Sequence, residues 1–314
     1  MPPPPLNIQD AFSVKGQAVV VTGAGGLIGA VIAEAFAVNG AAVLLHDHLE
    51  KKKLHEKCDE LAGRGFPVAG FAADLAQPEE LRKIIPETIK QFGAVHTLVN
   101  CAGIPGSRAL GRENEHDFDR LYHVNVRALW LLTQEAAGPM KTAGGGAVVN
   151  IASINGHRAT FPCSLYGGTK AAVLNMTREM AVELAPQNIR VNSISPGWIQ
   201  PGGDRFKAVK QALTPPFAEA FERQFGPMMQ GKGMQFQPTA GSGAPPDVAM
   251  AVIYLSSPAA RFITGADILV DGGLLHQFPF HLESRQIRWK ALRRHLRKLP
   301  AEAWIAGRPA WMSD

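Results

Sequence analysis

A tyrosine and a lysine stand four residues apart in the segment Tyr166-Gly167-Gly168-Thr169-Lys170. Residues at positions i and i+4 lie one turn apart on the same face of a helix. A neighbouring ammonium group favours phenolate and so lowers the pKa of a phenol. The pair therefore predicts an acid/base group, Tyr166, that exchanges protons near neutral pH. A surface contact between Tyr166 and Lys170 is the alternative interpretation of the pair alone.

Other polar side chains stand where apolar segments end. Ser153 follows the apolar run 147–152 and lies 13 residues before Tyr166. Asn100 ends another apolar run, and Asn125 lies in an apolar helical pattern where an amide is unusual. With these companions, an active site explains the Tyr–Lys pair better than a surface contact does.

A glycine-rich segment, Thr22-Gly23-Ala24-Gly25-Gly26-Leu27-Ile28-Gly29, follows a strand-like run and precedes an apolar helical pattern. Glycines in this setting let the backbone turn sharply and approach a pyrophosphate. The helix N-terminus then supplies free N–H groups and a positive dipole end. A simple glycine-rich turn is the alternative, but the strand before it and the helix after it favour dinucleotide binding.

The next strand-like run, 41–46, ends at Asp47, which lies 18 residues after Gly29. A carboxylate here accepts hydrogen bonds from the adenosine ribose and repels a 2′-phosphate. No Arg or Lys in the glycine segment or directly after Asp47 attracts such a phosphate. The pattern therefore favours NAD over NADP, although Asp47 could also cap a helix. His46 and His48 flank it in poor metal geometry, so we expect no metal site.

Strand-like runs alternate with helical patterns over residues 14–277. This spacing predicts an α/β fold, a doubly wound parallel sheet of the Rossmann type in one domain. The expected strands are 18–22, 41–46, 67–72, 95–100, 147–152, 189–195 and 267–270. The expected helices are 28–39, 50–62, 78–92, 115–141, 164–185 and 246–257. We expect residues 1–13 to form an extended arm and 278–314 a C-terminal extension.

The net charge of +5 belongs to that extension, which has eight Lys and Arg against three Asp and Glu. Residues 1–277 are therefore neutral overall, and we expect no nucleic-acid partner. The extension also contains three of the five tryptophans. We expect it to dock on a neighbouring subunit. Contact with an anionic membrane surface and a solvated extension are the alternatives.

The composition restricts the class and location of the protein. An apolar fraction of 46% excludes global disorder. Cys58, Cys101 and Cys163 are widely spaced and suggest neither a disulfide framework nor a zinc site, so we expect a reducing, cytoplasmic environment. The N-terminus lacks the pattern of a signal peptide, and no run approaches the roughly 18–20 apolar residues of a membrane span.

Residues 198–245 interrupt the alternation with many Gly, Pro, Met and Phe residues. So long an interval inside a domain is usually a lid or a binding segment. Its Phe and Met side chains, between 204 and 236, suit an adaptable apolar pocket wall. We therefore predict a bulky, apolar or aromatic alcohol or ketone as substrate. A helix pair packed on the body or on another subunit is an equal alternative.

Over about residues 14–277, the chain resembles the short-chain dehydrogenase/reductase family. The resemblance is carried by the glycine segment, Asp47, Asp74-Leu75, Asn100-Cys101-Ala102-Gly103, Asn125, Ser153, Tyr166, Lys170, Pro196-Gly197, Ile263-Thr264-Gly265 and Val270-Asp271-Gly272-Gly273. Each motif is weak by itself, but the ordered set is specific.

The resemblance implies an NAD-dependent oxidoreductase that interconverts a secondary alcohol and a ketone. Tyr166 would exchange a proton with the substrate oxygen while hydride passes to or from nicotinamide, and Ser153 would hydrogen-bond that oxygen. Lys170 would bind the nicotinamide ribose and lower the pKa of Tyr166, and Asn125 would hold a water linking Lys170 to solvent. The implied cofactor-binding residues are Gly23, Gly25, Gly26, Leu27, Ile28, Gly29, Asp47, Asp74, Leu75, Asn100, Ala102, Gly103, Tyr166, Lys170, Pro196, Gly197 and Ile199.

Three features depart from the family pattern. The glycine spacing, with Leu27 where glycine is usual, is typical of the family's extended branch of epimerases and dehydratases. The other motifs fit the single-domain branch, which we favour because they span more of the chain. No Thr near Pro201 is available to bond the carboxamide. Gly167 and Gly168 cost about 1 kcal/mol each inside a helix, which leaves open whether a backbone or the cofactor approaches them.

Two other functions stay open at this point, an NAD-using epimerase or dehydratase and a non-catalytic NAD-binding scaffold. The intact Ser–Tyr–Lys set argues against the scaffold. As the family commonly does, the chain would form a homodimer or homotetramer through the helices at 115–141 and 164–185.

Overall fold

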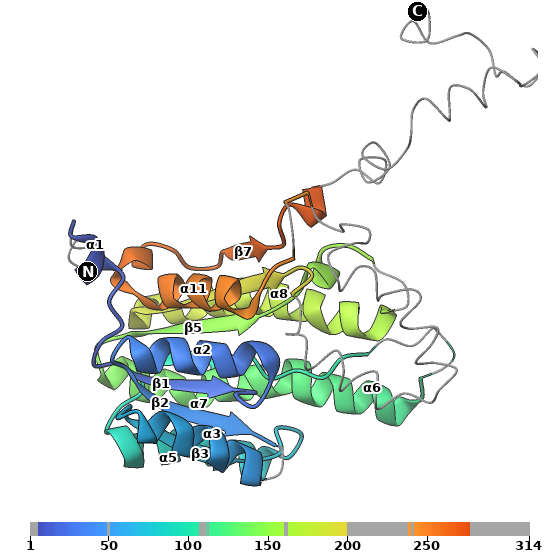
Figure 1. The fold of residues 1–314 in the computed structure, drawn as a ribbon. Helices are drawn as coiled ribbons and strands as arrows, with labels where there is room; N and C mark the ends of the chain where they lie inside the picture. The colour runs from blue at the N-terminus through green and yellow to red at the C-terminus, as the bar shows by residue number, and fades with distance from the viewer. Residues whose placement is uncertain are drawn as a thin grey trace, which may run out of the picture.

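The computed structural model describes residues 6–48, 51–106, 111, 113–159, 163–199, 238–239 and 242–276. The expected pocket-wall segment at 204–236, Pro201 and the basic extension at 278–314 lie outside the described residues. The described residues form one sheet with helices on both of its faces (Figure 1).

Seven strands pair in parallel in the order β3-β2-β1-β4-β5-β6-β7. The strands are β1 (Ala18–Thr22), β2 (Ala42–Asp47), β3 (Val68–Ala72), β4 (Thr97–Asn100), β5 (Gly146–Ile151), β6 (Ile189–Pro196) and β7 (Asp267–Val270). The order runs outward from β1 on one side and from β4 on the other, which confirms the doubly wound sheet. Burial on both faces explains the continuous apolar runs, such as Ala-Val-Val-Val-Thr in β1, where all five residues are buried.

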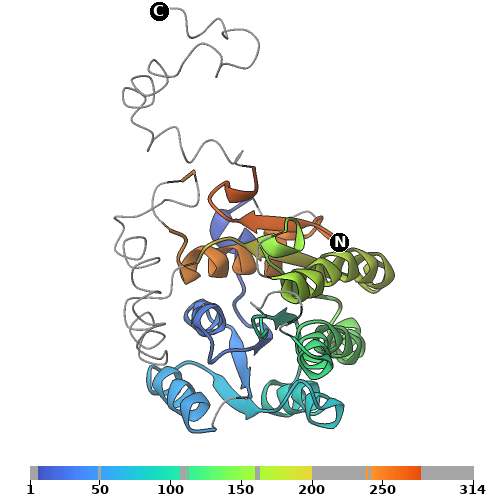
Figure 2. The ribbon, with the colours of Figure 1, turned by 90° about the vertical axis from the view of Figure 1, so that its right-hand side faces the viewer.

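Helices cover both faces of the sheet and follow the expected order. One face carries α2 (Leu27–Val38), α3 (Lys51–Gly63) and α11 (Pro245–Ser256), and the other carries α5 (Ile84–Phe92), α7 (Ala128–Thr142) and α8 (Ser164–Leu184). Figure 2 shows α2 and α11 on one side and α7 and α8 on the other. The shorter elements are α1 (Ile8–Ala11), α4 (Pro78–Leu81), α6 (Glu115–Tyr122), and the π-helix η1 (His123–Arg127). The 3-10 turns are η2 (Ile154–Gly156), η3 (Ala185–Gln187), η4 (Pro258–Ala260) and η5 (Leu274–His276).

Each face of the sheet has its own apolar core. Successive residues of a strand point to opposite faces, so Val19 and Val21 join the core under α2 and α11, whereas Val20 joins the core under α7 and α8. The two cores therefore support the sheet, including the carboxyl ends of its strands, from both faces.

Three expected elements differ in detail. Residues 8–11 are not extended but form α1, because the Asn7 side chain caps this turn by accepting from the Gln9 N–H at 2.9 Å. The helix expected at 78–92 is divided into α4 and α5. The helix expected at 115–141 contains the wider turn η1, which separates α6 from α7.

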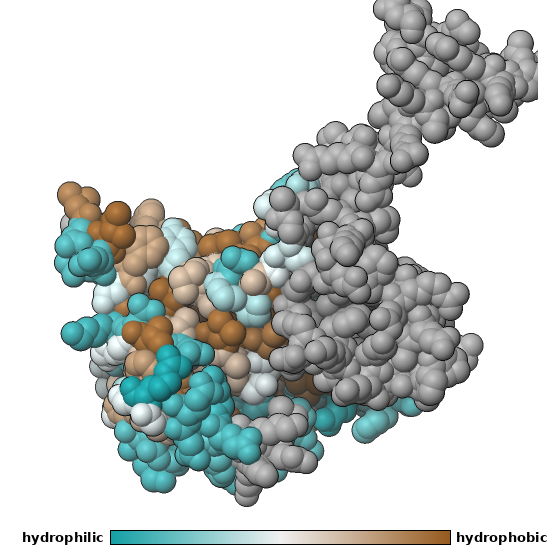
Figure 3. Space-filling model, viewed as in Figure 1, coloured by the Kyte–Doolittle hydropathy of each residue, from teal (hydrophilic) through white to brown (hydrophobic). Residues whose placement is uncertain are grey.

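The surface seen in Figure 3 is hydrophilic over α3 and more apolar near α1 and α11. Glu34 of α2 forms ion pairs with Lys57 of α3 and with Arg64, at 3.5 and 2.6 Å. The ring of Phe12, which follows α1, stacks on Tyr254 of α11. No helix within the described ranges is long and apolar enough to cross a membrane.

Gly29→Ala should destabilise the protein, because a Cβ at this position of α2 would overlap the carbonyl oxygen of Gly23. Overpacking of this kind costs roughly 1–3 kcal/mol of unfolding free energy, measured by urea denaturation. Gly63→Ala at the end of α3 is the matched control. Its Cβ would meet no atom within 4 Å, so this variant should be at least as stable as the wild type. Equal stability of Gly29→Ala and the wild type would contradict the close approach.

Candidate active site

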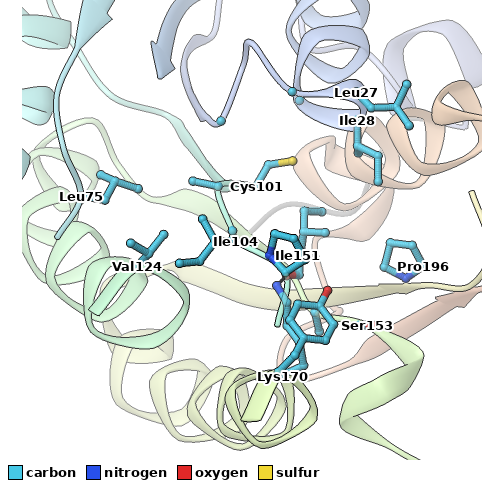
Figure 4. Close-up of a pocket in the computed structure, with 18 of the residues that line it drawn as sticks. Leu27, Ile28, Leu75, Cys101, Ile104, Val124, Ile151, Ser153, Lys170 and Pro196 are labelled. Atoms are coloured by element: carbon cyan, nitrogen blue, oxygen red, sulfur yellow. Dashed lines mark hydrogen bonds between the residues drawn. The ribbon is translucent and has the colours of Figure 1, made fainter. Parts of the chain in front are cut away.

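The segments that follow the carboxyl ends of the strands enclose one cavity of about 740 Å³ (Figure 4). The cavity lies where the strand order reverses between β1 and β4, the place where open α/β sheets bind their ligands. The sequence-predicted residues that line it are Gly23, Gly26, Leu27, Ile28, Gly29, Asp47, Asp74, Leu75, Ala102, Gly103, Ser153, Tyr166, Lys170, Pro196, Gly197 and Ile199. Gly25, Asn100 and Asn125 do not line this cavity.

Gly25 instead fixes the carboxylate of Asp47. Its N–H donates to Asp47 Oδ2 at 2.8 Å, and the N–H of His48 donates to Oδ1 at 2.7 Å. Asp47 is only 5% exposed, yet it lines the cavity. The carboxylate is thus held beside the glycine segment, where it can accept from a sugar hydroxyl.

The N-terminus of α2 faces the same end of the cavity. Gly26 is its N-cap and has no side chain to satisfy the first free N–H groups. Gly23 has φ +69°, and a Cβ there would lie 2.8 Å from the Cα of Ala102. The tight packing of the glycine segment on the segment after β4 leaves free N–H groups and a positive dipole end available for an anion.

His46 is buried beside Asp47. Its Nε2 donates to the carbonyl oxygen of Ala73 at 3.0 Å, and burial lowers its pKa to about 4. The ring is therefore neutral at physiological pH. Among the residues that the structure describes, no three His, Cys, Asp or Glu side chains form a metal-binding group.

Asn100 does not line the cavity but joins the elements that carry its walls. Its Nδ2 donates to Asn150 Oδ1 at 2.8 Å, and Asn150 Nδ2 donates to Thr177 Oγ1 at 2.9 Å. This buried chain links β4, β5 and α8. The N–H groups of Cys101 and Ala102 both donate to Thr22 Oγ1 at 3.1 Å, which ties the end of β4 to the end of β1.

Asn125 lies in the π-helix η1, and its amide holds the loop after β4. Its Oδ1 accepts from the Ile104 N–H at 2.9 Å, and its Nδ2 donates to the Ile104 carbonyl at 3.0 Å and to Thr169 Oγ1 at 3.2 Å. Asn125 and Lys170 also line a second cavity of about 10 Å³, close to the smallest size that admits one water molecule. The water that the resemblance places beside Asn125 stays a prediction.

Ser153, Tyr166 and Lys170 come together on one wall of the cavity. Figure 4 shows Ser153, Lys170 and Ile151 in the same region of the cavity, and the side chains of Ser153 and Tyr166 are hydrogen-bonded. Lys170 Nζ donates to the Ile151 carbonyl at 2.7 Å and lies 5.7 Å from the centre of the Tyr166 ring. The three side chains that the sequence analysis groups into one active site therefore line the same part of the cavity.

Burial governs the titration of this wall. Burial raises the pKa of Tyr166, and a hydrogen bond with the Ser153 side chain acts in the opposite direction. Burial lowers the pKa of Lys170 to about 8. The lowered Tyr166 pKa that we expect from the sequence is not found, because the loss of hydration outweighs the hydrogen bond with Ser153.

The two glycines inside α8 admit protein atoms. A Cβ at Gly167 would lie 3.0 Å from the carbonyl oxygen of Asn155, and one at Gly168 would lie 3.3 Å from Tyr122 Oη. The groups that closely approach Gly167 and Gly168 therefore belong to turn η2 and to α6, a question that the sequence left open.

Several lining residues were not among those expected to bind the cofactor. They are His46, His48, Cys101, Ile104, Pro105, Arg120, Val124, Ile151, Ala152 and Trp198. Leu75, Val124 and Ile104 lie along one part of the cavity (Figure 4). Arg120 lies there too, with Nη1 3.9 Å from Asp74 Oδ2. The four-residue spacing of Arg120 and Val124 was the available signal, since it places both on one face of a helix.

Lys170→Met should change stability in a pH-dependent way. The folded pKa of Lys170, about 8, is below its ordinary value of 10.5. Between these two pH values the amine is protonated in the unfolded chain but neutral in the folded protein. The cost of burying the charged amine therefore lowers the unfolding free energy fully below pH 8 and no longer above about pH 10.5. The unfolding free energy of the wild type should therefore rise relative to that of Lys170→Met as pH increases through this window. Urea unfolding at several pH values measures it, and a constant difference would contradict the buried amine.

Comparisons with known proteins identify the family of the chain. A family model described as enoyl-(acyl carrier protein) reductase matches residues 23–275. The 7alpha-hydroxysteroid dehydrogenase of Escherichia coli (strain K12) is 32% identical over 264 residues, which are 84% of this chain and 96% of that protein.

Solved structures share the fold over most of the chain. A 7 alpha-hydroxysteroid dehydrogenase complexed with NADH and 7-oxo glycochenodeoxycholic acid has a TM-score of 0.73 at 32% identity, with 84% of this chain and 96% of that one covered. A putative NAD(P)-dependent gluconate 5-dehydrogenase from Beutenbergia cavernae, with bound NADP, has a TM-score of 0.73 at 28% identity over 85% of this chain and 100% of that one. The family model, the relative and the shared fold together show that the chain belongs to the short-chain dehydrogenase/reductase family and is an oxidoreductase acting on hydroxyl groups.

Proposed function

We propose that the protein is an NAD-dependent dehydrogenase that interconverts a bulky apolar secondary alcohol and its ketone, with Tyr166 as the acid/base. One observation carries this proposal. A single cavity joins the buried carboxylate of Asp47 and the wall of Ser153, Tyr166 and Lys170. A dinucleotide placed along it would have its ribose at Asp47 and its reactive ring at Tyr166.

The residues at the Asp47 end fit the adenosine half and the pyrophosphate of such a cofactor. The backbone of Gly23 packs too closely on Ala102 for a side chain, and the N–H groups of α2 are open to an anion. Asp74 and Leu75 line the same end, where an adenine would lie. NAD, when bound, supplies the nicotinamide ring that accepts the hydride from the alcohol carbon.

The residues of the opposite wall hold and move the proton. For ketone reduction, the raised pKa of Tyr166 keeps a proton on the phenol, ready for transfer to the substrate oxygen. Ser153 hydrogen-bonds the same oxygen and orients it. For alcohol oxidation, Tyr166 must accept the proton, so a positive charge on Lys170 would assist this direction. Lys170 is 5% exposed and reaches both the Ile151 carbonyl and the space where a cofactor ribose would lie.

NAD is proposed over NADP because of how Asp47 is held. Its two oxygens already accept from Gly25 and His48, so the carboxylate cannot turn away from a 2′-phosphate. A buried negative charge fixed beside such a phosphate is strongly repulsive. One solved relative contains NADH and another contains NADP, so the relatives alone leave both cofactors open for this chain.

A bulky apolar substrate is proposed from the wall near Tyr166 and from one relative. Pro196, Trp198 and Ile199 line the cavity on the β6 side. The relative with 32% identity is named for a hydroxysteroid, a large apolar secondary alcohol. The dehydrogenase names of the relatives argue against the epimerase or dehydratase alternative.

A homodimer or homotetramer remains our proposal for the assembly. Trp130 on α7 is 43% exposed and Val182 on α8 is 75% exposed. Exposed large apolar side chains on these two helices support pairing with a second copy through them.

NAD reduction should be fastest with apolar ring alcohols. We expect a higher kcat/KM for cholic acid and 1-phenylethanol than for gluconate, measured from NADH absorbance.

Tyr166→Phe should lower kcat at least about 100-fold, the scale of a lost general acid/base, without weakening NAD binding. Near-normal turnover of this variant would refute the role of Tyr166. A preference for gluconate would refute the substrate class, and wild-type inactivity with every alcohol would favour the scaffold alternative.

Asp47→Ala should weaken NAD and spare NADP. Loss of the carboxylate removes a hydrogen-bond acceptor for the ribose and a repulsive charge toward the 2′-phosphate. We expect Kd for NAD to rise about 10-fold or more, as for the loss of one charged hydrogen bond, while Kd for NADP stays constant or falls. Calorimetric titration measures both. Equal weakening of the two cofactors would show that Asp47 only supports the glycine segment.

A further inference from the structure

A polar cluster lies outside the cavity, where β6 and β7 meet the turn after Ser153. Asp267 is the first residue of β7, and its Oδ1 accepts from Ser193 Oγ at 2.6 Å and from Ser195 Oγ at 3.0 Å. His157 Nε2 contacts the other carboxylate oxygen, Oδ2, at 2.9 Å. The reaction proposed above uses none of the four side chains of this cluster.

The residue types match those of a hydrolytic triad, but their arrangement does not. In a triad, the two ring nitrogens of histidine contact the serine and the aspartate separately. Here the same Nε2 contacts Asp267 and also Ser195 Oγ, at 3.2 Å. Ser195 is fully buried, so its hydroxyl is out of reach of a substrate. The cluster therefore joins β6, β7 and the turn after Ser153 to one another.

The bond from His157 attaches an accessible turn to the rigid end of the sheet. A carboxylate only accepts, so Nε2 carries the hydrogen and donates it to Asp267. Asp267 pairs in register with Ser193, which is 1% exposed. His157 is the residue directly after turn η2, and its side chain is 32% exposed.

Turn η2 begins at Ser153, the residue that faces Tyr166. Ser153 is its N-cap, and the Ser153 Oγ accepts from the Asn155 N–H at 3.2 Å. The N–H of Gly156 donates to the Ser153 carbonyl at 2.9 Å, and the N–H of His157 donates to the Ile154 carbonyl at 3.0 Å. These bonds make one tight unit, so a shift of His157 also shifts the Ser153 hydroxyl.

The opposite side of the turn rests on α8 at the level of the catalytic wall. A Cβ on Gly156 would lie 2.8 Å from the carbonyl of Lys170, and one on Gly167 would lie 3.0 Å from the carbonyl oxygen of Asn155. The turn is thus confined between α8, which carries Tyr166 and Lys170, and the Asp267 carboxylate.

From this geometry we infer that His157 is a positioning residue. Through its bond to Asp267, it fixes turn η2 and so holds the Ser153 hydroxyl against Tyr166. The inference rests on the proposed role of Ser153 in alcohol oxidation.

Two substitutions of His157 separate the bond from the bulk of the ring. His157→Phe keeps a ring but donates no hydrogen bond, whereas His157→Gln keeps an N–H donor. With the alcohol that the wild type oxidises fastest, we expect His157→Phe to lower kcat about 10-fold, since a small misplacement slows the reacting groups strongly. His157→Gln should recover most of this loss, and Kd for NAD should not change in either variant. His55→Phe, the same change at an exposed histidine of α3, should leave kcat unaltered.

A Ser153→Ala background tests whether His157 acts through Ser153. Without the hydroxyl there is nothing left to position, so adding His157→Phe should change kcat less than about 2-fold. A further 10-fold loss in this background would overturn the inference, as it would show general damage to the site. Wild-type kcat for His157→Phe alone would overturn it as well.

Amide hydrogen exchange tests the same bond without any substrate. His157→Phe should speed exchange of the Gly156 and His157 N–H groups about 10-fold or more, because the turn can then open locally. Exchange in β5 should stay unchanged. Unchanged exchange in the turn would overturn the inference even if the enzyme is active. Wild-type inactivity with every alcohol would instead defeat the proposed function, and the exchange result would still decide whether the bond fixes the turn.

Discussion

Parallel pairing of the central strands is the constraint on which the site depends. Pairing of β1 with β4, of β4 with β5, and of β5 with β6 brings the ends of four strands to one edge. Hydrogen bonds between side chains then fix neighbouring ends to each other. Thr22 accepts two backbone N–H groups from the segment after β4, and the chain from Asn100 through Asn150 to Thr177 joins β4, β5 and α8. Groups that are far apart in the sequence therefore share one cavity wall.

Burial at this edge sets the charge states of the cavity. Loss of hydration raises the pKa of Tyr166, lowers that of Lys170 to about 8, and raises that of the Cys101 thiol to about 12. The thiol therefore stays protonated at neutral pH and is a poor nucleophile. Burial thus favours the neutral form of each group, because it makes the Tyr166 phenol and the Cys101 thiol harder to deprotonate and the Lys170 ammonium easier to deprotonate.

The order of strands and helices could be predicted because apolar periodicity is a local signal. The site motifs could be predicted for a similar reason, since Tyr166 and Lys170 share one helix turn and Asp47 directly ends a strand. The bond between His157 and Asp267 could not, because it joins residues 110 apart in the sequence. The raised pKa of Tyr166 was also missed, because it depends on how deeply neighbouring elements bury the phenol. Nothing in the spacing of residues records that depth.

The π-helix η1 has a consequence for comparing this chain with others. It winds five residues, 123–127, into a wider turn between two regular helices. A chain one residue shorter here would form an unbroken α-helix, and α6 would be rotated by about 100° relative to α7. Residues of α6 such as Arg120, which lines the cavity here, would then point in another direction, while α7 kept its packing on the sheet. A single-residue gap at this point of an alignment therefore records a change of the binding surface, although it resembles a neutral difference in length.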